Sequence, residues 1–327
     1  MRIDFSAPTV PLGYDAPLNQ VAEFPLLGVP LRIESNSATV IAAAHTSFCG
    51  WRRLSNNEIA PIPPRMLRVV VQASDTLPSP STALIQRAHS GSFLAMGAGC
   101  MLTANYVAGH ALAVVTPSFA ADELALRYQV LECLALLLVY NQDRLPIQAG
   151  AITRGNHTIL LLGASNSGKS TLSYAALRCG FSLLAEEGVA LSSNDGLRFW
   201  GNPWRLHLPA DAPRFFPELA HSAPQRHPNG KWRIILDSTE HFPDQLRLSA
   251  NEATLCILDH HARMDSRLEP IAPAEILQQL TQRTGSLYDL WPLPAPVAQT
   301  LAAQGGYRLT MGRDLAGAVE LLGIMVA

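Results

Sequence analysis

The chain has 327 residues, of which 48% are hydrophobic and 15% are charged, which is enough for one large domain or two ordinary ones. Its formal net charge is -2, so no overall positive field favours binding to nucleic acid or to an anionic membrane surface. We therefore expect neither a nucleic-acid partner nor a membrane partner.

The sequence also bears on the compartment. The N-terminal residues show no basic segment followed by an apolar run, so no secretory signal is predicted. The longest mainly apolar stretch, residues 125–140, carries Arg127 and Glu132 and is shorter than the ~20 residues of a membrane span. The five cysteines are far apart, without C-x-x-C spacing, which indicates reduced thiols. We expect a cytoplasmic protein, and the sequence leaves a homo-oligomeric state open.

Short strands separated by turn residues are expected in the first part of the chain, at residues 30–33, 67–72, 92–97 and 111–116. From residue 120 the apolar spacing changes, and recurring leucines predict a buried helix over residues 120–141. This change places the expected domain boundary between residues 118 and 119. Residues 1–118 would form an α+β region that recognises a substrate or partner, and residues 119–327 a nucleotide-binding domain.

The second part of the chain has the pattern strand, loop, helix, strand. An apolar run at residues 158–162 predicts a strand, residues 170–178 predict a helix that ends at Gly180, and residues 181–185 predict the next strand. Further strands are expected at residues 188–191, 197–200, 246–248 and 253–258, and helices at 273–280 and 314–325. Residues 210–240 are rich in proline and histidine, which favours a loop or lid.

One segment fits the phosphate-binding pattern G-x-x-x-x-G-K-[ST] at every position. Its residues are Gly163, Ala164, Ser165, Asn166, Ser167, Gly168, Lys169 and Ser170. The glycines let backbone N–H groups converge on phosphate oxygens, and the helix that follows directs its positive end at the same anion. The flanking strand and helix are the context that this motif requires.

The expected ligand is a nucleoside triphosphate such as ATP, together with Mg²⁺. Lys169 is expected to reach the β and γ phosphates, and the Ser170 hydroxyl to bind Mg²⁺. Thr171 is expected to contribute its backbone N–H. Lysine is rare in this chain, where only Lys169 and Lys231 occur and arginine supplies the other basic side chains apart from histidine. A lysine kept at this position suggests that arginine would not serve.

Two carboxylates, Glu186 and Glu187, follow the predicted strand at residues 181–185. Carboxylates at the end of a strand beside a phosphate loop suit a general base or a magnesium ligand. Glutamates at a strand end are also often simply solvated. The spacing alone leaves both interpretations open.

These residues together resemble a known family. The segments at residues 147–151, 160–162, 163–170 and 184–187 are similar to the HPr kinase/phosphorylase group, and more closely to its HPr-kinase-related relatives found beside peptide-modification genes. The turn and strand at residues 201–206 also resemble those relatives. The likeness implies an α/β fold: a P-loop kinase core with a mixed sheet, as in HPr kinases and carboxykinases, plus an N-terminal α+β region.

The resemblance also implies an activity, in which ATP and Mg²⁺ are used to phosphorylate a hydroxyl, usually serine, of a protein or peptide. Carried over, Glu186 would be the base on that hydroxyl, and Glu187 would assist with metal or positioning. The family's acids are aspartates, however, and its histidine before the loop is Gln148 here. These departures favour an alternative, a nucleotide-binding pseudokinase that regulates or scaffolds a partner. A small-molecule kinase or a carboxykinase-like enzyme also stays open, because such enzymes share the fold class of HPr kinase.

Weaker candidates lie further along the chain. Arg205 is a possible phosphate or substrate contact, and Asp259 could be a magnesium ligand because it ends an apolar strand. Three arginines of the expected lid are further candidates for a phosphate contact: Arg214, Arg226 and Arg233. The adjacent His260 and His261 would point to opposite faces of a strand, so they are not expected to share a metal.

Overall fold

The computed structural model describes residues 17–77, 84–88 (backbone only), 91–140, 144–192, 196–227, 230–261, 264–282 and 291–326. In these ranges the protein is a mixed α/β structure with two mixed and two antiparallel sheets. The chain divides into two compact units, Met1–Gln142 and Asp143–Ala327. The units meet later in the chain than the expected boundary at residues 118 and 119, because the helices that follow residue 116 pack on the first sheet.

The first unit is built on a seven-stranded sheet with the order β1-β2-β3-β7-β6-β5-β4. Its strands are β1 (Gln20–Leu26), β2 (Val29–Ser35), β3 (Arg65–Val71), β4 (Leu84–Ala88), β5 (Ser92–Gly97), β6 (Cys100–Asn105) and β7 (His110–Val115). The neighbours β2, β3 and β7 are parallel, and the other pairs are antiparallel. The four strands expected before residue 118 correspond to β2, β3, β5 and β7.

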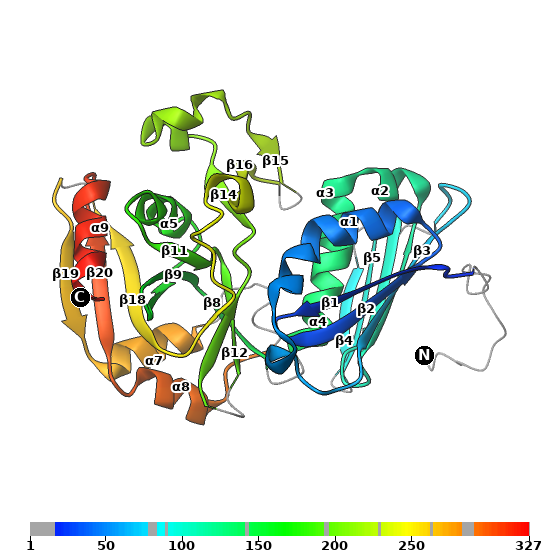
Figure 1. The fold of residues 1–327 in the computed structure, drawn as a ribbon, viewed down its shortest axis with the longest axis horizontal. Helices are drawn as coiled ribbons and strands as arrows, with labels where there is room; N and C mark the ends of the chain where they lie inside the picture. The colour runs from blue at the N-terminus through cyan, green and yellow to red at the C-terminus, as the bar shows by residue number, and fades with distance from the viewer. Residues whose placement is uncertain are drawn as a thin grey trace. The chain divides into compact units, whose positions relative to one another are not determined.

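Helices cover one face of this sheet, with α1 and α4 in contact with its strands (Figure 1). The helical elements are α1 (Ala38–Phe48), η1 (Cys49–Arg53), η2 (Asn56–Glu58), α2 (Pro117–Ala121), α3 (Glu123–Ala125), η3 (Leu126–Glu132, a π-helix) and α4 (Cys133–Tyr140). The single helix expected at residues 120–141 is therefore divided. Asp122 ends α2 and caps α3, because its carboxylate accepts a hydrogen bond from the Ala125 N–H at 3.0 Å.

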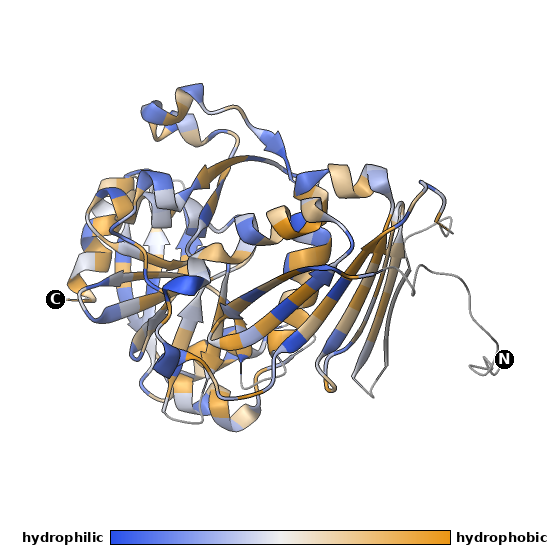
Figure 2. Ribbon diagram, turned by 45° about the vertical axis from the view of Figure 1, so that its right-hand side comes forward, coloured by the Kyte–Doolittle hydropathy of each residue, from blue (hydrophilic) through white to orange (hydrophobic). Residues whose placement is uncertain are grey.

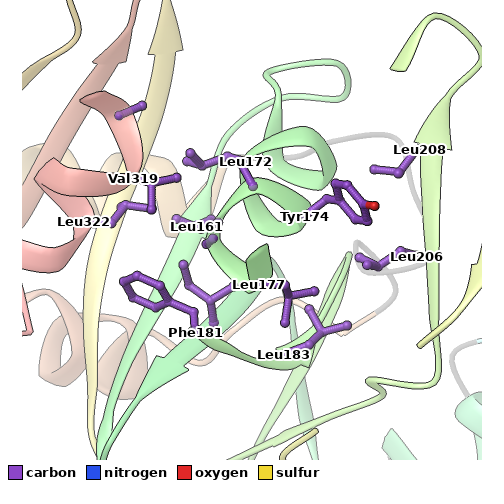
Figure 3. Packing of buried hydrophobic residues seen from close by; sticks show 14 of the residues in the cluster. Leu161, Leu172, Tyr174, Leu177, Phe181, Leu183, Leu206, Leu208, Val319 and Leu322 are labelled. Carbon is purple, nitrogen blue, oxygen red and sulfur yellow. The ribbon is translucent and has the colours of Figure 1, made fainter. Parts of the chain in front are cut away.

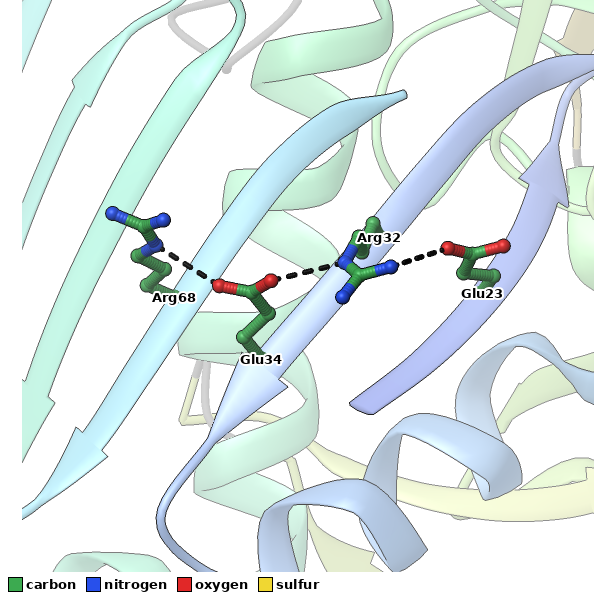
Figure 4. A network of polar contacts seen from close by, with 4 residues as sticks. All are labelled: Glu23, Arg32, Glu34 and Arg68. Carbon is green, nitrogen blue, oxygen red and sulfur yellow. Dashed lines mark hydrogen bonds and ion pairs between the residues drawn. The ribbon is translucent and has the colours of Figure 1, made fainter. Parts of the chain in front are cut away.

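Charged side chains line the opposite face of the first three strands. Alternate residues of β2 are buried and partly exposed, as a strand with one covered face requires. Hydrophilic and hydrophobic colours alternate along the strands of this sheet in Figure 2. Arg32 contacts Glu23 at 2.9 Å and Glu34 at 2.9 Å, and Arg68 contacts Glu34 at 3.1 Å (Figure 4). The four side chains form an ion-pair ladder across β1, β2 and β3.

The second unit contains the other three sheets. A six-stranded sheet has the order β11-β9-β10-β18-β20-β19, a four-stranded sheet the order β17-β13-β12-β8, and a three-stranded sheet the order β14-β16-β15. The strands are β8 (Leu145–Gln148), β9 (Gly150–Arg154), β10 (His157–Leu162), β11 (Ser182–Ala185), β12 (Gly188–Ser192), β13 (Arg198–Gly201), β14 (Arg205–Pro209), β15 (Gln225–Arg226), β16 (Trp232–Asp237), β17 (Ser249–Ala250), β18 (Ala253–His260), β19 (Arg267–Ile271) and β20 (Gly306–Met311).

The helices of the second unit are α5 (Lys169–Arg178), η4 (Ala212–Arg214), η5 (Pro217–His221), α6 (Ser238–His241), α7 (Pro273–Thr281), α8 (Ala295–Ala302) and α9 (Leu315–Ile324). Four of them, α5, α7, α8 and α9, pack against the six-stranded sheet. Alternate residues of β10 join different clusters: Leu161 packs with residues of α5 and α9, and Leu160 packs with residues of α7 and α8. Figure 3 shows the first of these clusters. Burial on both faces explains why residues 159–162 are continuously apolar.

The elements expected around the phosphate motif are present as β10, α5, β11, β12, β13 and β18, and the two late helices as α7 and α9. Two expectations are wrong. Residues 246–248 form no strand beyond one isolated bridge from Leu246 to Leu183, and the segment at 210–240 contains strands β15 and β16 besides short helices. No helix among the described residues is long and apolar enough to cross a membrane.

Candidate functional site

The 163–170 loop joins the carboxyl end of β10 to the first turn of α5. Its two glycines have positive backbone angles, with φ of +150° at Gly163 and +93° at Gly168. A Cβ at Gly163 would lie 2.7 Å from Ser167 Oγ, and one at Gly168 would lie 2.5 Å from Met311 Cε. The backbone conformation therefore favours glycine at both positions.

Lys169 is buried and its ammonium group points back into the loop. Nζ donates to the carbonyl oxygens of Gly163 at 2.7 Å and Ala164 at 2.8 Å, and to Ser167 Oγ at 3.4 Å. Burial lowers the pKa of Lys169, and the nearby charges of Glu187 and Glu186 oppose that shift without cancelling it. The ammonium group is thus held inside the loop by neutral oxygen acceptors.

The start of α5 is open to an anion. Gly168, its N-cap residue, supplies no side-chain cap, and the first turn contains no acidic residue. The first N–H groups of a helix have no acceptor within the helix, and they carry the positive end of its dipole. Ser170 and Thr171 belong to this turn, while Ala164, Ser165 and Asn166 are exposed.

Sheet topology brings Glu186 to this loop. Both β10 and β11 pair antiparallel with β9, so they run in the same direction and their carboxyl ends reach the same edge of the sheet. Glu186 follows β11 directly, as the loop follows β10. Glu186 Oε1 accepts a hydrogen bond from Ser170 Oγ at 2.7 Å. The expected magnesium-binding hydroxyl and the first acid of the pair are therefore in contact.

The second oxygen of Glu186 contacts a histidine. Glu186 Oε2 lies 2.6 Å from His207 Nδ1, and the glutamate side chain is only 11% exposed. Burial alone would raise the pKa of Glu186, but the charge of His207 and the hydrogen bonds from His207 and Ser170 together lower it below the ordinary value. An ionised carboxylate only accepts hydrogen bonds, so Nδ1 of His207 carries the hydrogen.

Glu187 and Gln148 lie beside Glu186 without sharing its contacts. Glu187 is exposed in the bend between β11 and β12, and its charge influences Lys169. Gln148 ends β8 and pairs with Gly188, the residue after Glu187. The backbone carbonyl of Glu186 lies 3.1 Å from where a Cβ at Gly150 would be, so this turn packs closely on the start of β9.

His207 was not among the candidates that the sequence suggested, whereas Arg205 was. Both lie on β14, whose buried residues Leu206 and Leu208 alternate with them. Arg205 and His207 therefore lie on the same face of β14. That alternation was visible in the sequence, but the position of the strand against α5 was not.

The weaker candidates are more scattered. Asp259 is exposed and pairs with Arg308 at 3.2 Å. Arg214 pairs loosely with Asp211 at 3.9 Å. Arg226 and Arg233 lie on β15 and β16. Among the described residues, no group of three or more histidine, cysteine, aspartate or glutamate side chains is placed to hold a metal ion by itself.

The donor set around Ser170 nevertheless suits Mg²⁺ that arrives with a nucleotide. Mg²⁺ is usually held by one or two carboxylates together with substrate phosphates and water, not by a cage of protein ligands. Ser170 and Glu186 supply one hydroxyl and one ionised carboxylate at the mouth of the 163–170 loop. The residues present therefore fit such an ion.

Comparisons with known proteins give matches among solved structures alone. No family model matches the chain, and no curated protein matches it. Among solved structures, a similar chain is the Hpr(Ser) kinase/phosphatase from Coxiella burnetii, with 14% sequence identity and a TM-score of 0.27. The match covers 55% of this chain and 92% of that one. A likeness with so low a TM-score carries no argument about function, which must come from the geometry of the site.

Proposed function

We propose that this protein binds a nucleoside triphosphate with Mg²⁺ at residues 163–171 and is a kinase of the HPr-kinase-like group. The observation that carries the proposal is the contact between Ser170 and Glu186 beside the 163–170 loop. A complete phosphate motif, a lysine turned into the loop and an uncapped helix start would each suit a phosphate chain. The carboxylate at the serine adds a place for its metal ion.

Each residue of the site has a proposed role. Backbone N–H groups of the loop and of Thr171 bind the phosphates, and Lys169 exchanges its carbonyl contacts for phosphate oxygens. Ser170 and Glu186 hold Mg²⁺, and Glu187 assists from its exposed position. Gln148 and Arg205 flank the site as substrate or phosphate contacts. When bound, the triphosphate supplies the phosphoryl group that a hydroxyl acceptor, a serine of a protein or peptide, receives.

The base that takes the acceptor proton is proposed to be Glu186, as in the family that the sequence resembles. A lowered pKa makes Glu186 a weak base but a good metal ligand. The replacement Glu186→Gln separates these two roles, because glutamine keeps the shape and loses the charge. A pure base role predicts lost transfer with unchanged affinity for Mg-ATP, and a metal role predicts that Mg²⁺ no longer strengthens ATP binding.

Calorimetry with Mg-ATP tests the binding site. Lys169→Ala should weaken binding by about tenfold or more, because a charge-assisted contact to phosphate is lost. Arg178→Ala is the matched control, since it removes an exposed cation from the opposite end of α5. Unchanged affinity in Lys169→Ala would show that the 163–170 loop is not the nucleotide site.

Mass spectrometry of candidate acceptors, after incubation with ATP and Mg²⁺, tests the reaction. A phosphate on a serine of a protein or peptide would support the kinase. A phosphorylated metabolite would instead identify a small-molecule kinase. Binding of Mg-ATP without transfer to any acceptor would favour the pseudokinase, which the substitution of both family aspartates by Glu186 and Glu187 also suggests.

A further inference from the structure

The chain's second lysine lies against the same loop as the first. Lys231 immediately precedes β16, and its Nζ donates to Ser165 Oγ at 3.0 Å. The turn that carries it is held by hydrogen bonds from the His227 N–H to the Lys231 carbonyl and from the Gly230 N–H to the His227 carbonyl, both at 2.8 Å. Lys231 is exposed, so its ammonium group can still meet a ligand.

The two ammonium groups contact neighbouring residues. Lys169 donates to the carbonyl oxygen of Ala164, and Lys231 donates to the side chain of the next residue, Ser165. An anion bound at this loop would be attracted by both positive charges. Lysine also suits a phosphate chain, because it is a compact positive charge with three donors on a flexible stem.

Strand pairing fixes how Lys231 reaches the loop. β16 pairs antiparallel with β14 from Arg205–Asp237 to Pro209–Arg233, so the three-stranded sheet that carries Lys231 also carries His207. His207 contacts Glu186, and the rings of His207 and His227 are 5.2 Å apart. One small sheet thus contacts the 163–170 loop through Lys231 and the metal-binding carboxylate through His207.

We propose that Lys231 is a second phosphate-binding cation, supplied to the nucleotide's phosphate chain by the turn before β16. This inference rests on the proposed nucleotide site. It adds a residue outside the phosphate motif and gives the segment at residues 210–240 a role in ligand binding. On binding, Lys231 exchanges its contact with Ser165 for a phosphate oxygen.

Lysine labelling offers a direct test, because the chain contains only two lysines. The full-length protein is treated with an amine-reactive reagent, with and without Mg-ATP, and the labelled peptides are quantified by mass spectrometry. Labelling of Lys231 should fall severalfold in Mg-ATP, while the N-terminal amine provides the internal reference. In Lys169→Ala, the same concentration of Mg-ATP should give much less protection of Lys231.

Calorimetry supplies the second measurement. Lys231→Gln should weaken Mg-ATP binding by about tenfold, the effect of a charge-assisted contact, and Lys231→Arg should restore part of the loss. Arg178→Gln is the matched control, because it removes an exposed cation from the far end of α5. Because Lys231 is exposed, the thermal unfolding of Lys231→Gln should match that of the wild type.

The two proposals fail differently. If Lys169→Ala binds Mg-ATP as the wild type does, the nucleotide site itself is wrong. If Lys169→Ala loses binding while Lys231→Gln behaves like Arg178→Gln, only the role of Lys231 is overturned. Unchanged labelling of Lys231 at saturating Mg-ATP would overturn it as well.

Discussion

Replacing Glu186 by glutamine should destabilise the second unit even without a ligand. The carboxylate accepts hydrogen bonds from Ser170 and His207, and its side chain is only 11% exposed, so solvent screens these contacts little. A hydrogen bond to a charged group contributes about 1 kcal/mol more than a neutral one. Two such contacts predict a loss of about 2 kcal/mol in the free energy of unfolding, or roughly 4–8 °C in Tm for a unit of this size.

The pH dependence shows whether the charge is responsible. The pKa of Glu186 in the folded protein lies below its ordinary value of 4.5, so its ionised form contributes stability above that pH. This contribution is lost as the pH falls through the folded pKa. The gap between the wild type and Glu186→Gln should therefore be widest near neutral pH and should narrow below 4.5.

Urea denaturation in metal-free buffer, followed from neutral to acidic pH, measures that gap. Glu187→Gln is the matched control, because it removes a carboxylate from the adjacent, exposed position. This control should change the free energy of unfolding by less than about 0.5 kcal/mol. A gap for Glu186→Gln that is independent of pH, or equal to that of Glu187→Gln, would refute the reasoning.

Three further substitutions test other parts of the structure. Gly168→Ala places a side chain at a φ of +93° and against Met311, so it should lower the free energy of unfolding by at least about 1–2 kcal/mol in chemical denaturation. It should also weaken Mg-ATP binding. Wild-type stability and binding would show that the loop needs no glycine at this position. Phe181→Ala empties a fully buried position and should cost about 3–5 kcal/mol, whereas a loss below 1 kcal/mol would contradict the packing in Figure 3. Glu34→Gln breaks the partly exposed ladder of Figure 4 and should cost no more than about 1 kcal/mol in thermal unfolding at low salt. In about 1 M salt that cost should largely vanish, and a loss insensitive to salt would count against an electrostatic origin.

The features predicted best from the sequence depend on neighbouring residues. The glycines, the lysine and the apolar run before them specify a strand, a loop and a helix within one short segment, and β10 and α5 are found there. The sequence also suggested that Glu186 lies beside the loop, because it ends the strand that follows the predicted helix. Glu186 Oε1 accepts a hydrogen bond from Ser170 Oγ, so the carboxylate does lie at the loop.

The features that were missed depend on pairing between distant segments. The pairing of β14 with β16 brings His207 and Lys231 to one side of the site. The spacing of residues in the sequence does not predict this pairing. The proline and histidine content of residues 210–240 favoured a loop, so β16 was not predicted. The division of the chain at residues 142 and 143 depends on tertiary contacts as well, because the sequence does not show on which unit the buried helices after residue 118 pack.

The parallel pairing of β10 with β18 and of β18 with β20 has a consequence for biosynthesis. Leu160 pairs with Leu255, Cys256 pairs with Tyr307, and a Cβ at Gly163 would lie 3.1 Å from the Leu258 carbonyl oxygen. A nascent chain is synthesised from its N-terminus, so residues 163–170 leave the ribosome long before the strands that support them. Such contacts between distant segments form slowly, because the long intervening loop must first close. A ribosome-bound chain stopped at residue 250 would carry the whole phosphate motif without the neighbouring strand that shapes it.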